Sequence, residues 1–400
     1  MRFPGFEGEW ESCELGDIAE FSKGAGISKD QRSSGGNPCI LYGELYTTYL
    51  SEIIDEVVSK TDLDPKGLVK SKANDIIIPA SGETAIDIST ARCVLKDNIM
   101  LGGDLNIIRL NEYDGKFFSY QLNGVRKKDI ARIAHGVSIV HLHGNALSRI
   151  VVNYPSRPEQ EKISLLLSLI DQRIAVQNKV IERLKSLIRG LNNKLMDNPL
   201  WDKVYIGDFM QFYSTNSLSW EQLSYENGRI RNLHYGLIHI GLPTMTDCDG
   251  NTLPFIQSQF IPKQFTICKD GDIAFADASE DTEEVGKAVE LYNTDSMDVV
   301  CGLHTIHGRD IMGITTAGFK GFAFNSKYFH NQLRRLAQGS KVYSITAENI
   351  KKCYIHIPKV TDQRKIVGLL LCLQDKIECA ERELNIFEMQ KRFMLREMLV

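Results

Sequence analysis

The stretch Pro158–Met196, PEQEKISLLLSLIDQRIAVQNKVIERLKSLIRGLNNKLM, decides the fold of this chain. Ten of its positions follow one another at alternating steps of four and three residues, which is the spacing of heptad core positions. They hold Ile163, Leu167, Ile170, Ile174, Gln177, Ile181, Leu184, Ile188, Leu191 and Leu195. One polar residue among nine large apolar ones predicts a coiled-coil helix. At about 1.5 Å per residue it would extend roughly 48 Å between the first and last of these positions.

A second copy of this pattern lies at the C-terminus. Adding 203 to each core position gives Ile366, Leu370, Leu373, Ile377, Ala380, Leu384, Phe387, Lys391, Met394 and Met398. All but the alanine and the lysine are large and apolar. The two helices are therefore expected to pair as an antiparallel coiled coil through these positions.

The segments before the two helices also echo each other. Leu15-Gly16-Asp17-Ile18 matches Ile206-Gly207-Asp208-Phe209, and Arg132-Ile133-Ala134-His135-Gly136 matches Arg335-Leu336-Ala337-Gln338-Gly339. The offset rises steadily from 191 to 203 between these matches, as small loop insertions in a second copy would produce. The chain is therefore predicted to be an internal repeat with a pseudo-twofold relation between its halves. The expected division is 1–157 and 198–360 for the globular segments, with long helices at 158–197 and 361–400.

Short strand signals without regular β-α alternation predict an α+β fold for each globular segment. The expected strands are Ile76–Pro79, Asn106–Leu110, Ile150–Tyr154, Leu237–Ile240, Ile273–Ala276 and Tyr354–Ile357.

Composition sets limits on the class of protein. The chain has 400 residues and a net charge of −4, and each globular segment carries −3, so neither has the basicity of a stand-alone nucleic-acid binder. There is no apolar run of membrane-spanning length and no signal-peptide core at the start. We therefore expect a cytoplasmic protein whose nine cysteines are reduced thiols.

Catalytic signatures are missing from the sequence. It contains no phosphate-binding G-x-x-x-x-G-K-[ST] loop, no nucleophile elbow and no methyltransferase-type Asn/Asp-Pro-Pro motif. The run Glu280–Glu284 is interpreted as a solvated acidic loop. A metal site at His135, His141 and His143 is disfavoured because the second copy has Gln338, Ser344 and Thr346 there. No C-x-x-C pair suggests zinc, so no metal and no cofactor is expected.

Two features favour macromolecular partners. Lys23, Lys29 and Arg32 lie in a Gly/Ser-rich loop near Tyr42 and Tyr46, a combination that suits DNA backbone and groove contacts, although a solvated loop explains it equally well. The first helix also carries a second apolar stripe, which a simple helix pair does not need. Its residues are Leu166, Leu169, Val176, Val180 and Leu187. Either the globular segments or another protein's helices cover it, and the candidate partner contacts are Leu166, Leu169, Val176 and Val180.

Several motifs accompany the order of globular segment, long helix, globular segment, long helix. They are Pro38–Thr47 (PCILYGELYT), Ile78–Thr84 (IPASGET), Gly102–Asn106 (GGDLN) and the two helix starts, Glu159–Ile163 (EQEKI) and Asp362–Ile366 (DQRKI). Together with that order, they resemble the specificity subunits of type I restriction-modification systems. The second half lacks the Y-G-E-L-Y-T run, so its DNA-contacting loops cannot be transferred from the first.

The resemblance implies a non-catalytic DNA-recognition subunit. Each globular segment would recognise half of a bipartite DNA target. The coiled coil would dock two modification subunits that methylate adenine, with restriction subunits joining through the complex. The candidate DNA-contacting residues are Lys23, Lys29, Arg32, Tyr42, Tyr46, Ser81, Arg132, Ser138, Arg335, Lys341 and Tyr343. The alternatives are a coiled-coil adaptor without DNA recognition and, more distantly, an enzyme with an unrecognised site.

Overall fold

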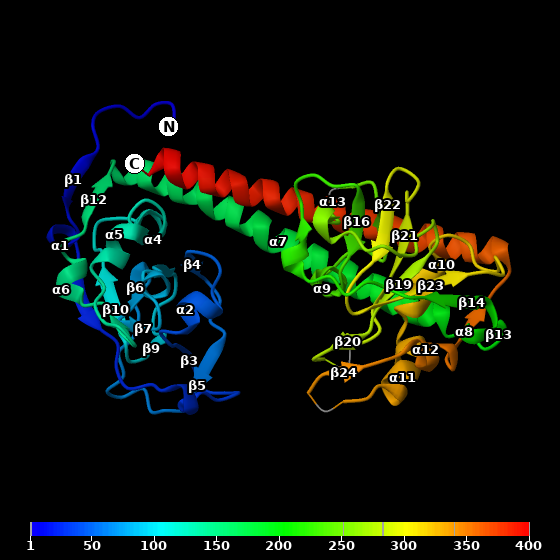
Figure 1. Cartoon of the computed structure of the whole chain (residues 1–400). Helices are drawn as coiled ribbons and strands as arrows, with labels where there is room; N and C mark the ends of the chain where they lie inside the picture. The colour runs from blue at the N-terminus through cyan, green and yellow to red at the C-terminus, as the bar shows by residue number, and fades with distance from the viewer. Residues whose placement is uncertain (1, 251, 282–283, 340, 400) are drawn as a thin grey trace. The chain divides into compact units, whose positions relative to one another are not determined.

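The computed structural model describes residues 2–250, 252–281, 284–339 and 341–399. The chain divides into two compact units (Figure 1), which we call unit 1, Met1–Lys179 with Ala380–Val400, and unit 2, Val180–Cys379. The boundary cuts both long helices near their middle, so each unit combines one globular body with one half of each helix.

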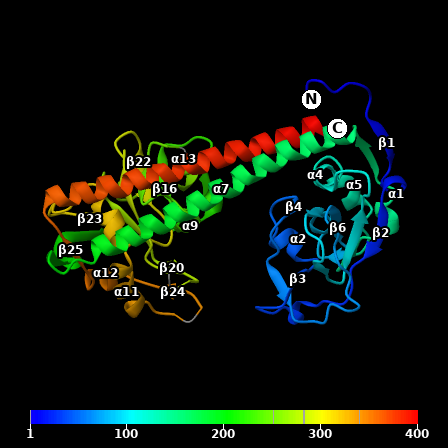
Figure 2. The ribbon, with the colours of Figure 1, turned by 180° about the vertical axis from the view of Figure 1, so that it is seen from behind.

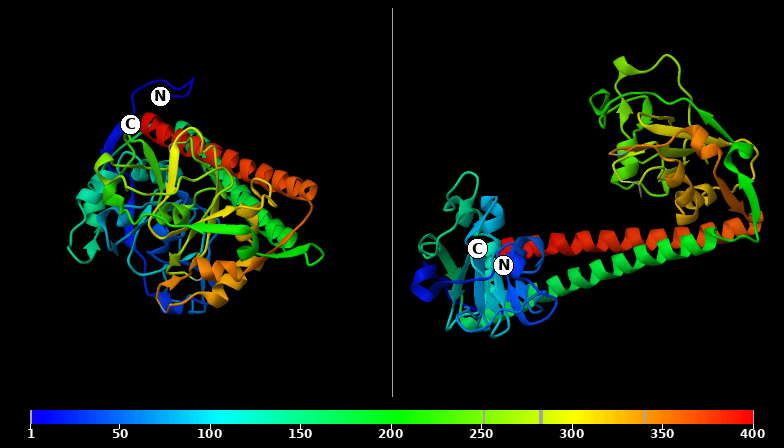
Figure 3. Two further views of the ribbon diagram at one scale, coloured as in Figure 1. Left: turned by 45° about the vertical axis from the view of Figure 1, so that its right-hand side comes forward. Right: turned by 90° about the horizontal axis from the view of Figure 1, so that it is seen from below.

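The two long helices are α7, Arg157–Met196, and α13, Val360–Met398. Figure 3 shows them running alongside each other within each unit. In unit 1 the Gln177 side chain donates to the Ala380 carbonyl at 2.9 Å, and the Arg173 guanidinium lies 4.8 Å from the centre of the Phe387 ring. The residue numbers of the partners in α13 rise as the residue numbers in α7 fall, so the two helices pair antiparallel, as predicted. None of the twenty heptad core positions is exposed.

Unit 1 is built on a five-stranded sheet in the order β2-β10-β6-β8-β4, where β4 and β8 are parallel and the other pairs antiparallel. These strands span Glu20–Lys23 (β2), Leu105–Arg109 (β10), Asp75–Pro79 (β6), Arg92–Val94 (β8) and Ile53–Ile54 (β4). The smaller sheets pair Glu11–Glu14 (β1) with Val151–Tyr154 (β12), Ser81–Gly82 (β7) with Val140–His141 (β11), and Asn37–Ile40 (β3) with Ser59–Thr61 (β5) and Met100–Leu101 (β9). The short helices are Leu15–Ile18 (α1), Lys29–Gln31 (η1), Glu44–Thr47 (α2), Ala85–Ile88 (α3), Gly115–Asn123 (α4), Lys127–Arg132 (α5) and Gly144–Leu147 (α6).

Unit 2 repeats this architecture with a sheet in the order β14-β23-β19-β21-β17 and a parallel pair at the same edge. Its strands span Met210–Tyr213 (β14), Thr305–Asp310 (β23), Ile273–Ala276 (β19), Ala288–Tyr292 (β21) and Met245–Asp247 (β17). The smaller sheets pair Asp202–Tyr205 (β13) with Tyr354–Ile357 (β25), Ala278–Ser279 (β20) with Tyr343–Ser344 (β24), and join Leu223–Ser224 (β15), Phe255–Ile256 (β18), Ile230–Leu233 (β16) and Asp298–Cys301 (β22). The short helices are Ile206–Phe209 (α8), Trp220–Gln222 (η2), Tyr235–Ile240 (α9), Ser258–Phe260 (η3), Phe319–Phe324 (α10), Lys327–Leu336 (α11) and Ala347–Lys351 (α12).

Equivalent hydrogen bonds confirm the internal repeat at the level of side chains. The carboxylate of Asp75 receives two bonds from Arg109 at 2.8 and 2.6 Å, and Asp272 receives two from Arg309 at 2.7 and 2.6 Å. A buried glutamine near the start of each long helix bonds backbone groups of its own globular body. This explains why the helix-start motif carries Gln160 in one copy and Gln363 in the other.

The largest buried apolar cluster of each unit joins its globular body to the long helices. In unit 1, Figure 2 shows α4 beside the sheet, where Phe117 and Phe118 share a buried cluster with Ile163 and Leu167 of α7. In unit 2 the corresponding cluster includes Leu370 of α13. Burial of the heptad core therefore fixes each globular body to the helix pair.

One predicted strand was wrong: residues 237–240 form the end of helix α9. The His234 ring nitrogen accepts the Gly236 N–H at 3.2 Å and caps the helix, and Gly241 ends it at a φ of 119°. Leu237 and Ile238 are buried on one face of the helix. A short apolar run fits a strand or a helical turn equally well, so the capping groups decided the outcome. No helix in the described part of the chain combines the length and the apolarity needed to cross a membrane.

Candidate nucleic-acid interface

An exposed hairpin turn carries candidate residues in unit 1. His135 and His141 exchange backbone hydrogen bonds of 3.0 and 2.7 Å, and β11 then pairs with β7, which contains Ser81. The turn between them is solvent-facing: Ser138 is exposed, and Val137 is 99% exposed. Ser81 itself is buried at the base of the hairpin. The exposed turn, and not its base, is thus the part available to a ligand.

Unit 2 forms the same hairpin 203 residues later. Gln338 and Ser344 exchange backbone bonds of 3.0 and 2.8 Å, and β24, which includes Tyr343, pairs with β20. Lys341 is exposed in this turn at the position of Ser138 in unit 1. Ser340 lies outside the described residues. The two units therefore present different side chains on one backbone frame.

A glycine fixes each hairpin. Gly136 has a φ of 133° and Gly339 a φ of 130°. A Cβ at either position would lie about 2 Å from a backbone oxygen, at 2.0 Å from Ile139 O and 1.9 Å from Val342 O. Only glycine fits this conformation and this contact. The shared R-[IL]-A-x-G motif thus ends in the residue that the turn requires.

Arg132 and Arg335 occupy equivalent places before these hairpins. Arg132 lies at the end of α5, exposed, and pairs with Asp129 at 3.0 Å. Arg335 is exposed in the last turn of α11. Both arginines precede their hairpins by a few residues in the sequence. The Asp129 carboxylate offsets part of the charge of Arg132.

The Gly/Ser-rich loop of unit 1 borders a pocket of about 650 Å³. Lys29, Arg32 and Tyr42 all line it, so the structure brings together three of the predicted residues. The Arg32 guanidinium lies 3.7 Å from the Glu44 carboxylate, which offsets part of its charge. Lys23 is exposed at the end of β2 and does not line the pocket.

Tyr46 connects this pocket to the hairpin base. Its hydroxyl lies 3.6 Å from the position that a Cβ on Gly82 of β7 would take. Burial raises the pKa of Tyr46, and the neighbouring Tyr42 hydroxyl and Asp87 carboxylate raise it further. The hydroxyl therefore stays protonated near neutral pH and can donate a hydrogen bond.

Equivalent residues in unit 2 were missed from the sequence. In both units a Ser-x-x-Gln capping box holds a single 3-10 turn, which places Trp220 where unit 1 has Lys29. The helix that follows starts with Tyr235-Gly236 where unit 1 has Tyr42-Gly43, and His239 takes the place of Tyr46. Trp220 is 42% exposed, and its ring lies 4.4 Å from that of His234. The repeated Tyr-Gly pair could have revealed this equivalence from the sequence, but the residues that follow it in unit 2 were expected to form a strand.

An apolar groove of about 870 Å³ runs along the helices of unit 1. Two residues of the predicted stripe, Leu169 and Val176, are 48% and 60% exposed within it. Leu166 is partly buried against the unit 1 core but also lines the groove, and Val180, in unit 2, is 40% exposed. Ile386 of α13 is 52% exposed and completes the groove. Its counterpart in α7 is Arg183, so the repeat gave no hint of it.

The acidic run offers little as a cation site. Thr282 and Glu283 lie outside the described residues, and Glu284 pairs with Lys287 at 3.0 Å. The rings of His141 and His143 stack with their centres 6.4 Å apart, and both side chains are exposed. We interpret the acidic run and the two histidines as ordinary polar surface.

Residues 7–186 match the family described as Type I restriction modification DNA specificity domain. The specificity subunit of the type I restriction enzyme MjaVIII from Methanocaldococcus jannaschii is 22% identical, and the match covers 98% of this chain and 92% of that protein. Residues 7–186 thus match the DNA specificity domain of type I restriction-modification systems, and nearly the whole chain is similar to a specificity subunit of such a system. Like other specificity subunits it is a DNA-recognition component and not the catalyst, so the adaptor alternative is not favoured.

Solved structures from type I restriction-modification systems share its fold. The S subunit from M. genitalium is 16% identical, with a TM-score of 0.62 over 100% of this chain and 97% of that one. A chain from the structure described as the structural basis of complex assembly and conformational transition of the type I R-M system is 13% identical. Its TM-score is 0.59 over 98% of both chains.

Proposed function

We propose that each unit of this specificity subunit recognises one half of a bipartite DNA target. The contacts would come from its hairpin turn and from the loops that border the pocket in unit 1, or that take the same place in unit 2. The observation that carries this proposal is that both units hold different side chains at matched positions of one frame. Ser138 corresponds to Lys341, and Lys29 to Trp220. A shared frame with exchanged contact groups is what two different half-sites require, since bases are distinguished by donor and acceptor patterns.

The same chain would bring the catalytic subunits to that target. The family implies DNA, modification subunits and restriction subunits as partners. We assign the apolar groove of unit 1 to a modification subunit, and propose two such subunits per chain, which methylate adenine. An acidic chain suits such a complex, because its partners would supply most of the phosphate contacts that dominate affinity.

A methylome tests the proposed function directly. Residues 1–155 would be exchanged for the same segment of a relative with a known target, and the host's methylated sites mapped with the native and the hybrid chain. We expect one half of the target to change and the other half to stay. A change in both halves, or in neither, would contradict recognition by separate units.

A binding measurement on the reconstituted complex complements the methylome. DNA that contains the mapped target should be retained more strongly than a scrambled duplex, and retention should fall steeply with salt. Equal retention of both duplexes would favour the adaptor alternative.

A further inference from the structure

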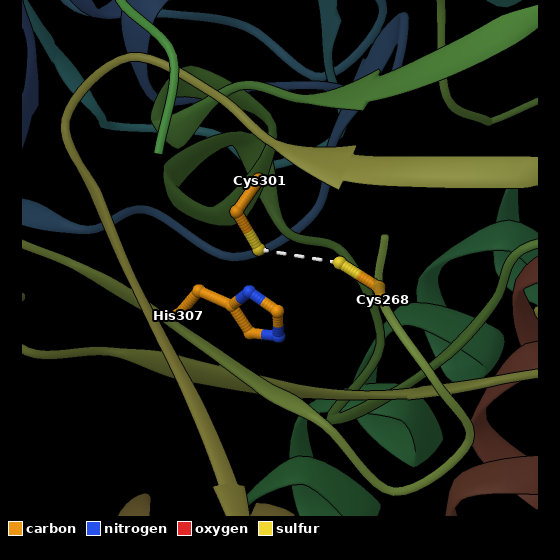
Figure 4. Close-up of side chains that lie close together, drawn as sticks. All are labelled: Cys268, Cys301 and His307. Atoms are coloured by element: carbon orange, nitrogen blue, oxygen red, sulfur yellow. Dashed lines mark hydrogen bonds between the residues drawn. The ribbon is translucent and has the colours of Figure 1, made fainter. Parts of the chain in front are cut away.

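Three buried side chains with metal-binding atoms meet inside unit 2. Cys268, Cys301 and His307 each offer one ligand atom, and these atoms lie within 4.8 Å of one another (Figure 4). Cys268 and Cys301 are 2% exposed and His307 is fully buried. No other such group of three occurs among the residues that the structure describes. We propose that these residues bind one thiophilic divalent cation, with Zn²⁺ as the expected metal.

The histidine is oriented as a metal ligand. Its Nε2 lies 2.7 Å from a carboxylate oxygen of Asp272, while its buried Nδ1 has no hydrogen-bond partner. Metal-binding histidines usually donate their second nitrogen to a carboxylate in this way, which fixes the tautomer and leaves the other nitrogen free to coordinate. Figure 4 shows the ring next to the two sulfur atoms. A cation between them would give the orphaned nitrogen a partner.

The distance between the sulfur atoms suits a shared cation. They lie 3.6 Å apart. Two thiolates bound tetrahedrally to Zn²⁺ at about 2.3 Å each would be about 3.8 Å apart. A disulfide would instead require the sulfurs to close to about 2.05 Å. Three protein ligands would leave one tetrahedral position for a water molecule or another small ligand.

The charges also balance once a cation is bound. Two thiolates neutralise a divalent ion, and the imidazole is neutral. The Asp272 carboxylate has its own counterion, because Arg309 donates to it at 2.7 and 2.6 Å. Zn²⁺ coordinates cysteine in its deprotonated form. Metal binding would therefore release protons and strengthen with pH.

The backbone holds the three ligands in place from separate elements. The Cys268 amide donates to Val299 O of β22 at 2.8 Å, and Cys301 ends that strand. His307 lies in β23, paired with β14 on one side and β19 on the other. Because β22 lies in the four-stranded sheet and β23 in the five-stranded sheet, a bound cation would join these two sheets of unit 2.

Unit 1 lacks these ligands, which provides a matched control. Its equivalent positions are Ser71, Leu101 and Ile107, and the hydroxyl of Ser71 donates to Lys96 O at 2.7 Å. The variant Cys268→Ser, Cys301→Leu, His307→Ile therefore gives unit 2 the residues of unit 1. Cys248→Ser removes another buried thiol of the same core cluster without touching the three ligands.

The test is metal content and cobalt spectroscopy of the full chain, purified in the presence of Zn²⁺ and then freed of loose ions. We expect one Zn²⁺ per chain, retained by Cys248→Ser and lost from the triple variant. Co²⁺ alone, added to metal-free protein, should give a thiolate-to-cobalt charge-transfer band. Asp272→Asn should weaken Zn²⁺ binding about tenfold to a hundredfold, while Asp75→Asn in unit 1 should not.

Two results would overturn the proposal. One is the absence of a cobalt–thiolate band from the native chain. The other is recovery of Cys268 and Cys301 as a disulfide under reducing purification. The cobalt measurement needs only the native chain, so it decides the matter even if the variants fail to fold.

Discussion

The two units fix their globular bodies to the long helices with different chemistry. In unit 1 a lysine at a heptad core position, Lys391, reaches Glu52 at 2.5 Å and Asp171 at 2.6 Å, and the Tyr120 hydroxyl donates to Asp171 at 2.7 Å. All four side chains are largely buried. Burial lowers the pKa of Lys391, but the two carboxylates outweigh it and raise the pKa, so the lysine stays charged.

Unit 2 has no such network at the equivalent place. The positions of Lys391, Asp171, Tyr120 and Glu52 are taken by Ile188, Gln374, Phe322 and Thr244. Ile188 and Phe322 belong to the apolar cluster of unit 2, and the Asn192 amide donates to the Phe322 carbonyl at 3.0 Å. The units therefore share their backbone frame, their apolar core and some polar contacts, such as the Asp75–Arg109 and Asp272–Arg309 pairs. At this contact between the globular body and the helices, however, their side chains differ.

The largest expected effect comes from breaking the unit 1 network. Lys391→Met removes the cation and leaves two buried carboxylates without their counterion, which should lower the free energy of unfolding of unit 1 by about 3–5 kcal/mol. Denaturant unfolding followed by probes in each unit would measure it. Burial raises the pKa of Glu52, so the loss should shrink as the pH falls and that carboxylate takes up a proton.

The matched control rebuilds unit 2 chemistry in unit 1. The variant Lys391→Ile, Asp171→Gln, Tyr120→Phe, Glu52→Thr removes both signs of charge together. We expect its free energy of unfolding to lie much closer to that of the native chain than that of Lys391→Met, because it removes the lysine together with both carboxylates. Equal losses for the two variants would show that packing of the lysine stem, and not charge pairing, holds unit 1 on the helices.

Equal losses of stability are expected in both units when a buried leucine at an equivalent heptad position is shortened. Leu167 and Leu370 occupy equivalent heptad positions, and both are fully buried. Leu167→Ala and Leu370→Ala should each cost about 2–5 kcal/mol in their own unit. The exposed neighbours Leu165 and Leu369 serve as controls and should change stability by no more than about 0.5 kcal/mol when replaced by alanine. A large effect in one unit alone would argue against a common frame.

The features that could be predicted from the sequence are those that a local period encodes. Heptad spacing predicted α7 and α13, and rising offsets between matched motifs predicted the repeat. The turn residue Gly136 could be matched to Gly339 because the surrounding residues are similar. These signals depend on neighbours in the chain, so tertiary contacts did not overrule them.

Features that depend on long-range contacts escaped prediction. Cys268 and Cys301 are 33 residues apart in the chain. They lie close to His307 only because of how the chain passes between the four-stranded and the five-stranded sheet of unit 2. Ile386 joins the groove from the far end of the chain and has no apolar counterpart in α7. Helix α9 was mistaken for a strand because its cap, His234, is not a common capping residue.

Substitutions in the groove along the helices should affect partner binding but not the stability of the chain. Leu169→Ser with Val176→Ser should leave the unfolding of the chain almost unchanged, since both side chains are about half exposed. If a modification subunit covers them, the double variant should bind that subunit with a loss of about 2 kcal/mol, or roughly thirtyfold. Titration of the native and variant chain with purified modification subunit would show it, and Leu187→Ser, exposed but outside the groove, is the control. Unchanged affinity would remove the groove from the partner interface.

The smallest expected effect concerns the hairpin turns, where the units differ by one charge. Lys341→Ala should lower the affinity of the reconstituted complex for target DNA a few-fold. It should also reduce the slope of log affinity against log salt by about 0.9, the amount expected for one lost phosphate contact. Ser138→Ala removes no charge and should leave the slope unchanged. Ser138→Lys should raise it by about the same 0.9, because the unit 1 hairpin shares the backbone frame of the unit 2 hairpin. If Lys341→Ala alters affinity at one salt concentration but not the slope, the lysine contacts a base or another residue. If neither lysine variant changes the slope, the hairpin turns do not approach the phosphates, and the loops around the unit 1 pocket become the stronger candidates.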